Sequence, residues 1–139
     1  MHMNLCRANI PIEMEPSLHA ETAQNQARVV SQAVLRAADS LALTAAELAR
    51  VIGSSEASLS RVRHHTRQIA LESKEGELGL LFLRVFRSLD ALLGSNREQA
   101  RAWLHAHNDH LRGVPIQRMH KVEGMVDVAE YLDALRGAF

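Results

Sequence analysis

The length, composition and charge of this chain exclude several classes of protein. Its 139 residues suffice for one domain, or for two small ones that share a core. With 47% hydrophobic and 23% charged residues, it has the composition of a globular protein rather than of a disordered tail. The single cysteine, Cys6, permits no internal disulfide, and no apolar run is long enough for a membrane span or a signal peptide. We therefore expect a cytoplasmic protein with no membrane partner, and since the net charge is zero, any binding to nucleic acid requires a local basic cluster.

The N-terminal part divides into an arm and a helix. Residues 1–20 show no periodicity and contain Pro11 and Pro16, so we expect a flexible arm. From Glu21 to Leu41, apolar residues recur at helical spacing and predict the first long helix.

Residues 44–63 have the pattern of a helix-turn-helix. Thr44 and Glu47 are spaced as a capping box at the start of a first short helix. Gly53 stands at a sharp turn, where glycine adopts the left-handed backbone without penalty. Ser54 or Ser55 then caps a second helix. The spacing favours a DNA-reading motif, although any tight helical hairpin has a similar one. The inward residues are expected to be Leu48, Ala49 and Ile52 in the first helix, and Leu59 and Val62 in the second.

A basic cluster follows the second helix of this motif. The stretch from Arg61 to Arg67 contains three arginines, has His64 and His65 between them and contains no acid. Its side chains could meet phosphates and base edges. The alternative is an ordinary solvated basic face, and Glu72, Glu75 and Glu77 close by indicate a small footprint on DNA. We expect DNA contacts from Thr44, Ser54, Ser55, Glu56, Ser58, Arg61, Arg63, His64 and Arg67.

The second half of the chain predicts four more helical segments and no strand. A linker through residues 69–76 leads to a helix over 78–92, whose apolar stripe is so broad that neighbours must cover more than one side. Gly94 stops this helix, and Ser95 with Glu98 forms a second capping box. A short segment over 115–121 ends before Gly124, and a last helix runs over 125–136. The predicted fold is all-α with seven helices.

From Leu78 onward the chain resembles the toxin-binding domain of the Xre/MbcA/ParS-type antitoxins of bacterial type II toxin–antitoxin systems. The preceding helix-turn-helix stands where that family has its Xre-like DNA-binding part, so the resemblance covers about residues 25 to 139. It implies three parts: an arm (1–20), a DNA-binding domain (21–74) and a domain for toxin binding and dimerisation (75–139). The resemblance is carried by Ala100, Trp103-Leu104, Asn108, Leu111-x-Gly113-x-Pro115-Ile116, Gly124 and Leu132-x-x-Leu135-Arg136-Gly137.

The resemblance also implies a function. Such antitoxins bind the operator of their own operon and neutralise a toxin, often a RES-domain enzyme that consumes NAD, whose active-site cleft the antitoxin's C-terminal segment approaches. A homodimer is expected, because a protein that reads paired half-sites is usually two-fold symmetric. The final helix departs from the family, which often carries an acid and a histidine where this chain reads Leu135-Arg136-Gly137-Ala138-Phe139. Arg136 is then the residue expected in an anionic pocket. The expected toxin contacts are Tyr131, Leu132, Leu135, Arg136 and Phe139.

Two other functions fit parts of the pattern. The chain could be a stand-alone helix-turn-helix regulator whose second half only dimerises or binds an effector. It could also be an enzyme or metal protein that uses His105, His107 and His110 with Asp109, although a polar helix end explains these residues as well. We expect no enzyme, no metal and no cofactor. Trp103 is expected to pack internally, with an exposed partner anchor as the alternative.

Overall fold

The computed structural model describes residues 14–138, and within this range it confirms the predicted all-α fold. Most of the expected arm (residues 1–13, with Cys6) and the expected toxin contact Phe139 lie outside the described residues. The described part contains seven helices and a single isolated β-bridge between Asn108 and Gly113. The helices are α2 (Met14–Ser40), α3 (Ala45–Ile52), α4 (Glu56–Arg63), α5 (Lys74–Leu93), α6 (Arg97–His105), α7 (Pro115–Arg118) and α8 (Val122–Ala138).

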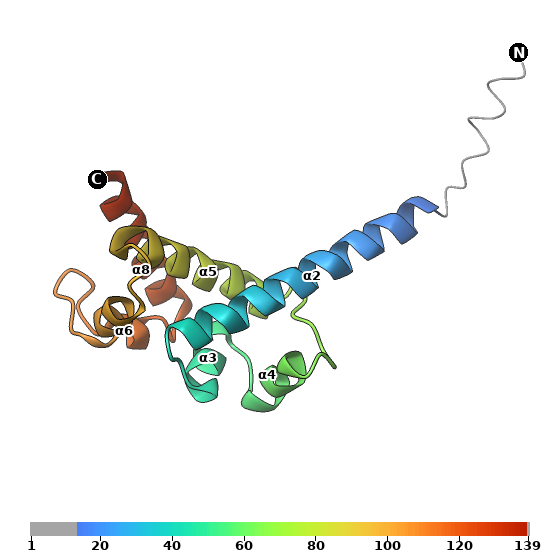
Figure 1. The fold of residues 1–139 in the computed structure, drawn as a ribbon, viewed down its shortest axis with the longest axis horizontal. Helices are drawn as coiled ribbons and strands as arrows, with labels where there is room; N and C mark the ends of the chain where they lie inside the picture. The colour runs from blue at the N-terminus through green and yellow to red at the C-terminus, as the bar shows by residue number, and fades with distance from the viewer. Residues whose placement is uncertain (1–13, 139) are drawn as a thin grey trace, which may run out of the picture.

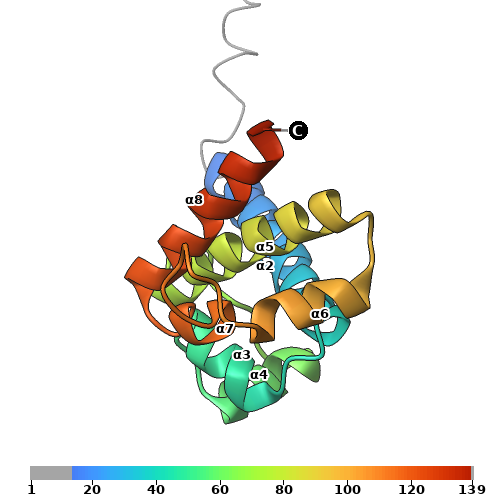
Figure 2. The same ribbon diagram turned by 90° about the vertical axis from the view of Figure 1, so that its left-hand side faces the viewer.

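Helix α5 forms the centre of the molecule. It packs against α2, α3, α6 and α8, and both ribbon views place it between α2 and α8 (Figures 1 and 2). Phe82 and Val85 are fully buried, and Leu83 on another side is 6% exposed, so the prediction of a helix covered on more than one side is confirmed. Leu80 is the exception, since it is 46% exposed.

One continuous hydrophobic core joins the two halves of the chain. It includes Val34 from α2, Ile52 from α3, Leu104 from α6 and Leu132 from α8, each at most 1% exposed. The predicted division at residues 74 and 75 falls in the first turn of α5 and stays a prediction. Whatever the division, the two halves share their interior and are expected to unfold together.

The first helix begins earlier than the sequence indicated. Helical backbone starts at Met14 rather than Glu21, so residues 14–20 are not the flexible segment that was expected. Pro16 does not prevent this, because backbone N–H groups in the first turn of a helix have no intrahelical acceptor to lose. The N-terminal half of α2 extends away from the body (Figure 1), and residues 18–26 are all exposed.

Two helices of the second half are capped by residues other than those expected. Ser95 does not cap α6, because it has a left-handed backbone with φ of 66°, whereas an N-cap needs an extended one. Asn96 caps it instead, and its Oδ1 accepts a hydrogen bond from the backbone N–H of Gln99 at 3.0 Å. Helix α5 begins at Lys74 after the cap Ser73, so the linker ends before Gly76.

Gly124 has a different role from the expected break between helical segments. It is the third residue of α8, which starts at Val122 rather than Met125. A Cβ atom at position 124 would lie 1.9 Å from the carbonyl oxygen of Arg118. Glycine is therefore needed because the backbones of α7 and α8 touch, and not because the chain must turn there.

Candidate DNA-binding and toxin-binding surfaces

The local signals of the helix-turn-helix are confirmed. The hydroxyl of Thr44 accepts from the backbone N–H of Glu47 at 3.1 Å, and the Glu47 carboxylate accepts from the N–H of Thr44 at 3.2 Å. Gly53 ends α3 with φ of 67°. Partial burial pulls the pKa of Glu47 upward, but the hydrogen bonds from Thr44 and the charge of His105 outweigh it, so this pKa lies below its ordinary value.

Helix α4 turns an apolar side inward and a polar side outward. Leu59 and Val62 are 3% and 1% exposed, as predicted. Of the two candidate caps, Ser55 acts: its Oγ accepts from the N–H of Ser58 at 3.1 Å, while the buried hydroxyl of Ser54 has no partner among the described residues. The outward side carries Ser55, Glu56, Ser60, Arg61, Arg63 and His64, all exposed, with Ser58 half-buried.

The three arginines of the basic cluster occupy different environments. Arg61 donates to the hydroxyl of Ser58 at 3.2 Å, so its charge meets no carboxylate in the described part of the chain. Both terminal nitrogens of Arg63 donate hydrogen bonds of 3.1 Å to the carboxylate of Asp39, and this pairing raises the pKa of the guanidinium. Arg67 donates to Glu75 at 2.6 Å, and the side chain of Glu75 is only 9% exposed. The sequence pattern showed the cluster and the acids near it, but not that Arg67 is held by a buried carboxylate or that Arg63 is shared with α2.

The glycine–proline motif of the second half closes a tight loop between α6 and α7. Asn108 and Gly113 exchange two backbone hydrogen bonds of 2.9 and 3.2 Å, and the Asn108 side chain accepts from the N–H of Leu111 at 3.0 Å. Leu111 and Ile116 anchor the loop in the core at 5% and 4% exposure. Pro115 is the first residue of α7, as predicted.

The expected toxin contacts are not all presented to a partner. Leu132 is 1% exposed and belongs to the core, so its side chain packs inside the molecule. Leu135 and Tyr131 are half-buried, and Arg136 is exposed. Arg136 donates to the hydroxyl of Ser88 at 3.3 Å, and Ser88 in turn donates to Asp133 at 3.0 Å.

Asp133 connects this end of α8 to α5. Its pKa lies below the ordinary value because Arg84 donates hydrogen bonds to it, and this effect, with the bond from Ser88, outweighs partial burial. The Arg84–Asp133 pair is partly exposed, with side-chain exposures of 46% and 36%. These contacts orient the last turns of α8 relative to α5.

Three aromatic rings lie close together in the second half of the chain. The ring of Tyr131 is nearly parallel to that of Trp103, with centroids 6.4 Å apart, and the ring of His110 lies 4.8 Å from Tyr131 at an angle of 31°. Trp103 packs against the core while remaining partly exposed, which lies between the two roles expected for it.

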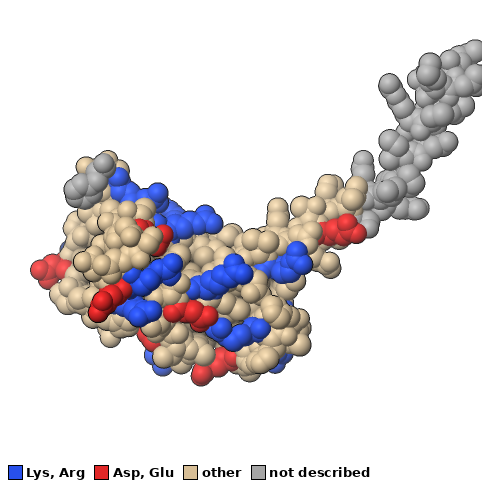
Figure 3. Space-filling model, in the orientation of Figure 1, with Lys and Arg blue, Asp and Glu red and all other residues tan. Residues whose placement is uncertain are grey.

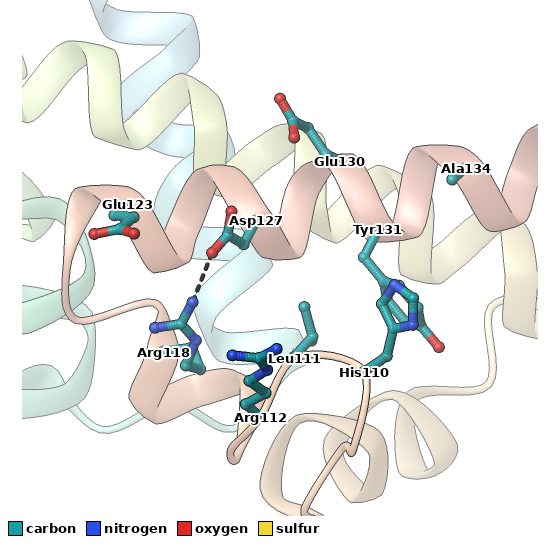
Figure 4. A pocket seen from close by; sticks show the side chains of 9 residues that line it. All are labelled: His110, Leu111, Arg112, Arg118, Glu123, Asp127, Glu130, Tyr131 and Ala134. Carbon is teal, nitrogen blue, oxygen red and sulfur yellow. Dashed lines mark hydrogen bonds and ion pairs between the residues drawn. The ribbon is translucent and has the colours of Figure 1, made fainter.

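A polar recess of about 700 Å³ lies between α8 and the loop that joins α6 to α7 (Figure 4). Arg118 projects from α7 toward Asp127 of α8 and donates to it at 2.6 Å, while Glu130 points away (Figure 4). Asp127 therefore acts as an ion-pair partner, and Glu123 sits in the first turn of α8, where an acid suits the helix dipole.

The histidines proposed as alternative ligands have separate partners. His105 lies 3.6 Å from Glu47 of α3, and His107 lies 3.1 Å from the fully exposed Asp109. Among residues 14–138, no group of three or more potential ligand side chains could hold a metal ion. None of the helices described is long and apolar enough to cross a membrane.

Comparison with known families identifies both halves. Residues 21–84 match the Antitoxin Xre-like helix-turn-helix domain, and residues 88–138 match the Antitoxin Xre/MbcA/ParS C-terminal toxin-binding domain. No curated protein matches the chain. The two matches follow each other along one shared core, with the helix-turn-helix caps and the Asn108–Gly113 loop in the corresponding halves. The chain therefore belongs to the Xre/MbcA/ParS antitoxins, which join a DNA-binding helix-turn-helix to a toxin-binding domain.

Proposed function

We propose that this antitoxin neutralises a RES-domain toxin, an enzyme that consumes NAD, by covering the toxin's active site with its C-terminal segment. The observation that carries the proposal is Arg136, an exposed residue near the end of α8 whose guanidinium donates only to the hydroxyl of Ser88 among the described residues. A cleft that binds the phosphates of NAD attracts a guanidinium, whose fork matches phosphate oxygens. Tyr131 and Leu135 precede Arg136 on α8 and are half-buried, whereas Leu132 contributes through the core and not through contact.

The same protein is proposed to repress its own operon as a homodimer. Helix α4 would lie in the major groove, with Ser55, Glu56 and Arg61 on its outward side, and the start of α3 at Thr44 would meet the phosphate backbone. Arg61 is the strongest candidate of the cluster for a phosphate or base contact, because Arg63 and Arg67 already pair with carboxylates. Two copies would read paired half-sites.

The C-terminal proposal needs a local change as its test. Deleting α8 would remove Met125, Val128 and Ala129, which are fully buried, so the truncated chain would not fold. Arg136→Glu instead reverses one exposed charge, and Lys121→Glu, just before the opposite end of α8, is the matched control.

The assay measures NAD consumption by the toxin encoded beside this antitoxin, with each variant added at equal concentration. We expect wild type and Lys121→Glu to block NAD consumption, and Arg136→Glu to release it. Equal inhibition by all three proteins would contradict the role of Arg136. If co-expression of the antitoxin rescued no growth defect caused by a neighbouring gene, the chain would instead be a regulator without a toxin partner.

A further inference from the structure

A groove of about 580 Å³ lies where α2, α5 and α6 meet, outside the helix-turn-helix and away from the end of α8. Its floor is apolar and contains Ala33, Ala37 and Phe86. Its walls carry three arginines, one from each helix: Arg36, Arg87 and Arg97.

Positive side chains outnumber negative ones in this groove. Arg36 and Arg87 are exposed, and neither makes an ion pair with any side chain that the structure describes. The guanidinium of Arg97 lies 5.3 Å from the centre of the Phe86 ring. Its Nε is 3.9 Å from the carboxylate of Asp90, and this distance is the longest among the ion pairs of the described residues. The single acid in the wall, Asp39, already accepts two hydrogen bonds from Arg63. The groove therefore presents net positive charge, although the whole chain has none.

The groove is continuous with the helix-turn-helix. Arg63, which holds Asp39 in the groove wall, is the last residue of α4. Ser40, also in the wall, ends α2, and only a short turn separates it from Thr44 at the start of α3. Figure 3 shows basic side chains spread across the face of the molecule over which α2 runs, with acidic side chains among them.

We propose that this groove binds the sugar-phosphate backbone of the duplex that α4 reads, with Arg36 and Arg87 as phosphate contacts. The inference rests on the proposed operator binding and extends the DNA surface beyond the helix-turn-helix. Arginine forks suit phosphate oxygens, and an apolar floor suits deoxyribose. Arg97 lies within the range matched by the toxin-binding domain and Arg87 just before it, so the DNA surface would extend onto the second half of the chain.

The test measures how binding to a 30-base-pair duplex of arbitrary sequence depends on NaCl concentration, followed by fluorescence anisotropy. Each phosphate contact contributes roughly 0.9 to the slope of log K against log salt. The double variant Arg36→Gln/Arg87→Gln should therefore lose about 1.8 from this slope, so that the affinity ratio between 50 and 200 mM NaCl falls about twelvefold. Arg112→Gln, an exposed arginine in the loop between α6 and α7, is the control and should leave the slope unchanged. Circular dichroism of each variant checks that the helices remain.

The outcomes separate this inference from the proposed function. If Arg61→Ala lowers the slope and the double variant does not, the helix-turn-helix binds DNA and the groove does not. If the wild-type protein shows no salt-dependent binding at all, the groove assignment and the proposed operator binding are both overturned. If the double variant keeps the wild-type slope but no longer inhibits the toxin, the groove binds an acidic segment of that protein and the DNA assignment is wrong.

Discussion

Replacing Gly124 by alanine should destabilise the protein, although alanine is the better helix former. A Cβ atom at this position would lie 1.9 Å from the Arg118 carbonyl oxygen and 2.6 Å from its carbonyl carbon. Since these are backbone atoms, relief requires α7 and α8 to separate by roughly 1 Å along the core. A clash this close lies at the upper end of the usual cost of overpacking, about 3 kcal/mol. The gain in helix propensity offsets about 1 kcal/mol of this. We expect a net loss of about 2 kcal/mol in the free energy of unfolding.

Gly137 provides a matched control in the same helix. A Cβ atom there has no heavy atom within 4 Å, so Gly137→Ala should bring only the propensity gain, about 0.5 kcal/mol near a helix end. Urea unfolding followed by circular dichroism measures both, with all proteins at one concentration because the stability of a dimer, as proposed above, would depend on concentration. With a denaturant slope of about 2 kcal/mol per M, the midpoint of Gly124→Ala should fall by about 1 M. A midpoint that rises, as expected for Gly137→Ala, would refute the close approach of the two helices.

Two further predictions concern ion pairs. Arg67→Ala should cost roughly 3 kcal/mol in urea unfolding, because it leaves the buried carboxylate of Glu75 without its partner, and a smaller loss in Arg67→Ala/Glu75→Gln would confirm the pairing. Asp133 has a folded pKa below its ordinary value of 3.8, so its stabilising effect is complete above that pH and is lost as the pH falls through the lower, folded pKa. Asp133→Asn should therefore lower the unfolding midpoint at pH 7 and flatten its decline below about pH 4, and an unchanged acid profile would contradict the bonds from Arg84 and Ser88.

Features that depend on a few neighbouring residues were predicted well. The capping box of Thr44 and Glu47, the left-handed Gly53 and the first-turn Pro115 all lie where the sequence indicated. Each is decided by hydrogen bonds or backbone sterics within about four residues, so the sequence contains all the information needed. Ser95 shows the limit of this reasoning. It has a left-handed backbone in the turn after α5, so Asn96 and not Ser95 is the N-cap of α6.

The candidate sites were predicted less completely. The sequence placed Arg63 and Arg67 in one basic cluster, but their partners Asp39 and Glu75 come from α2 and α5. Whether such a charge is available to DNA depends on these contacts, and no local pattern reports them. Similarly, the repeat of leucines in the last helix did not distinguish Leu132 in the core from the half-buried Leu135.

By itself, the sequence determined the helical class and the helix-turn-helix, because apolar periodicity and caps act over short distances. Its resemblance to the antitoxin family indicated the order of the two functional halves. Only the tertiary structure decided that α5 serves both halves as one core, that Gly124 marks a contact and not a break, and that arginines from α2, α5 and α6 line one groove. These properties arise from residues far apart in the chain. They exist only once the helices have packed, since packing and not local propensity sets which side chains meet.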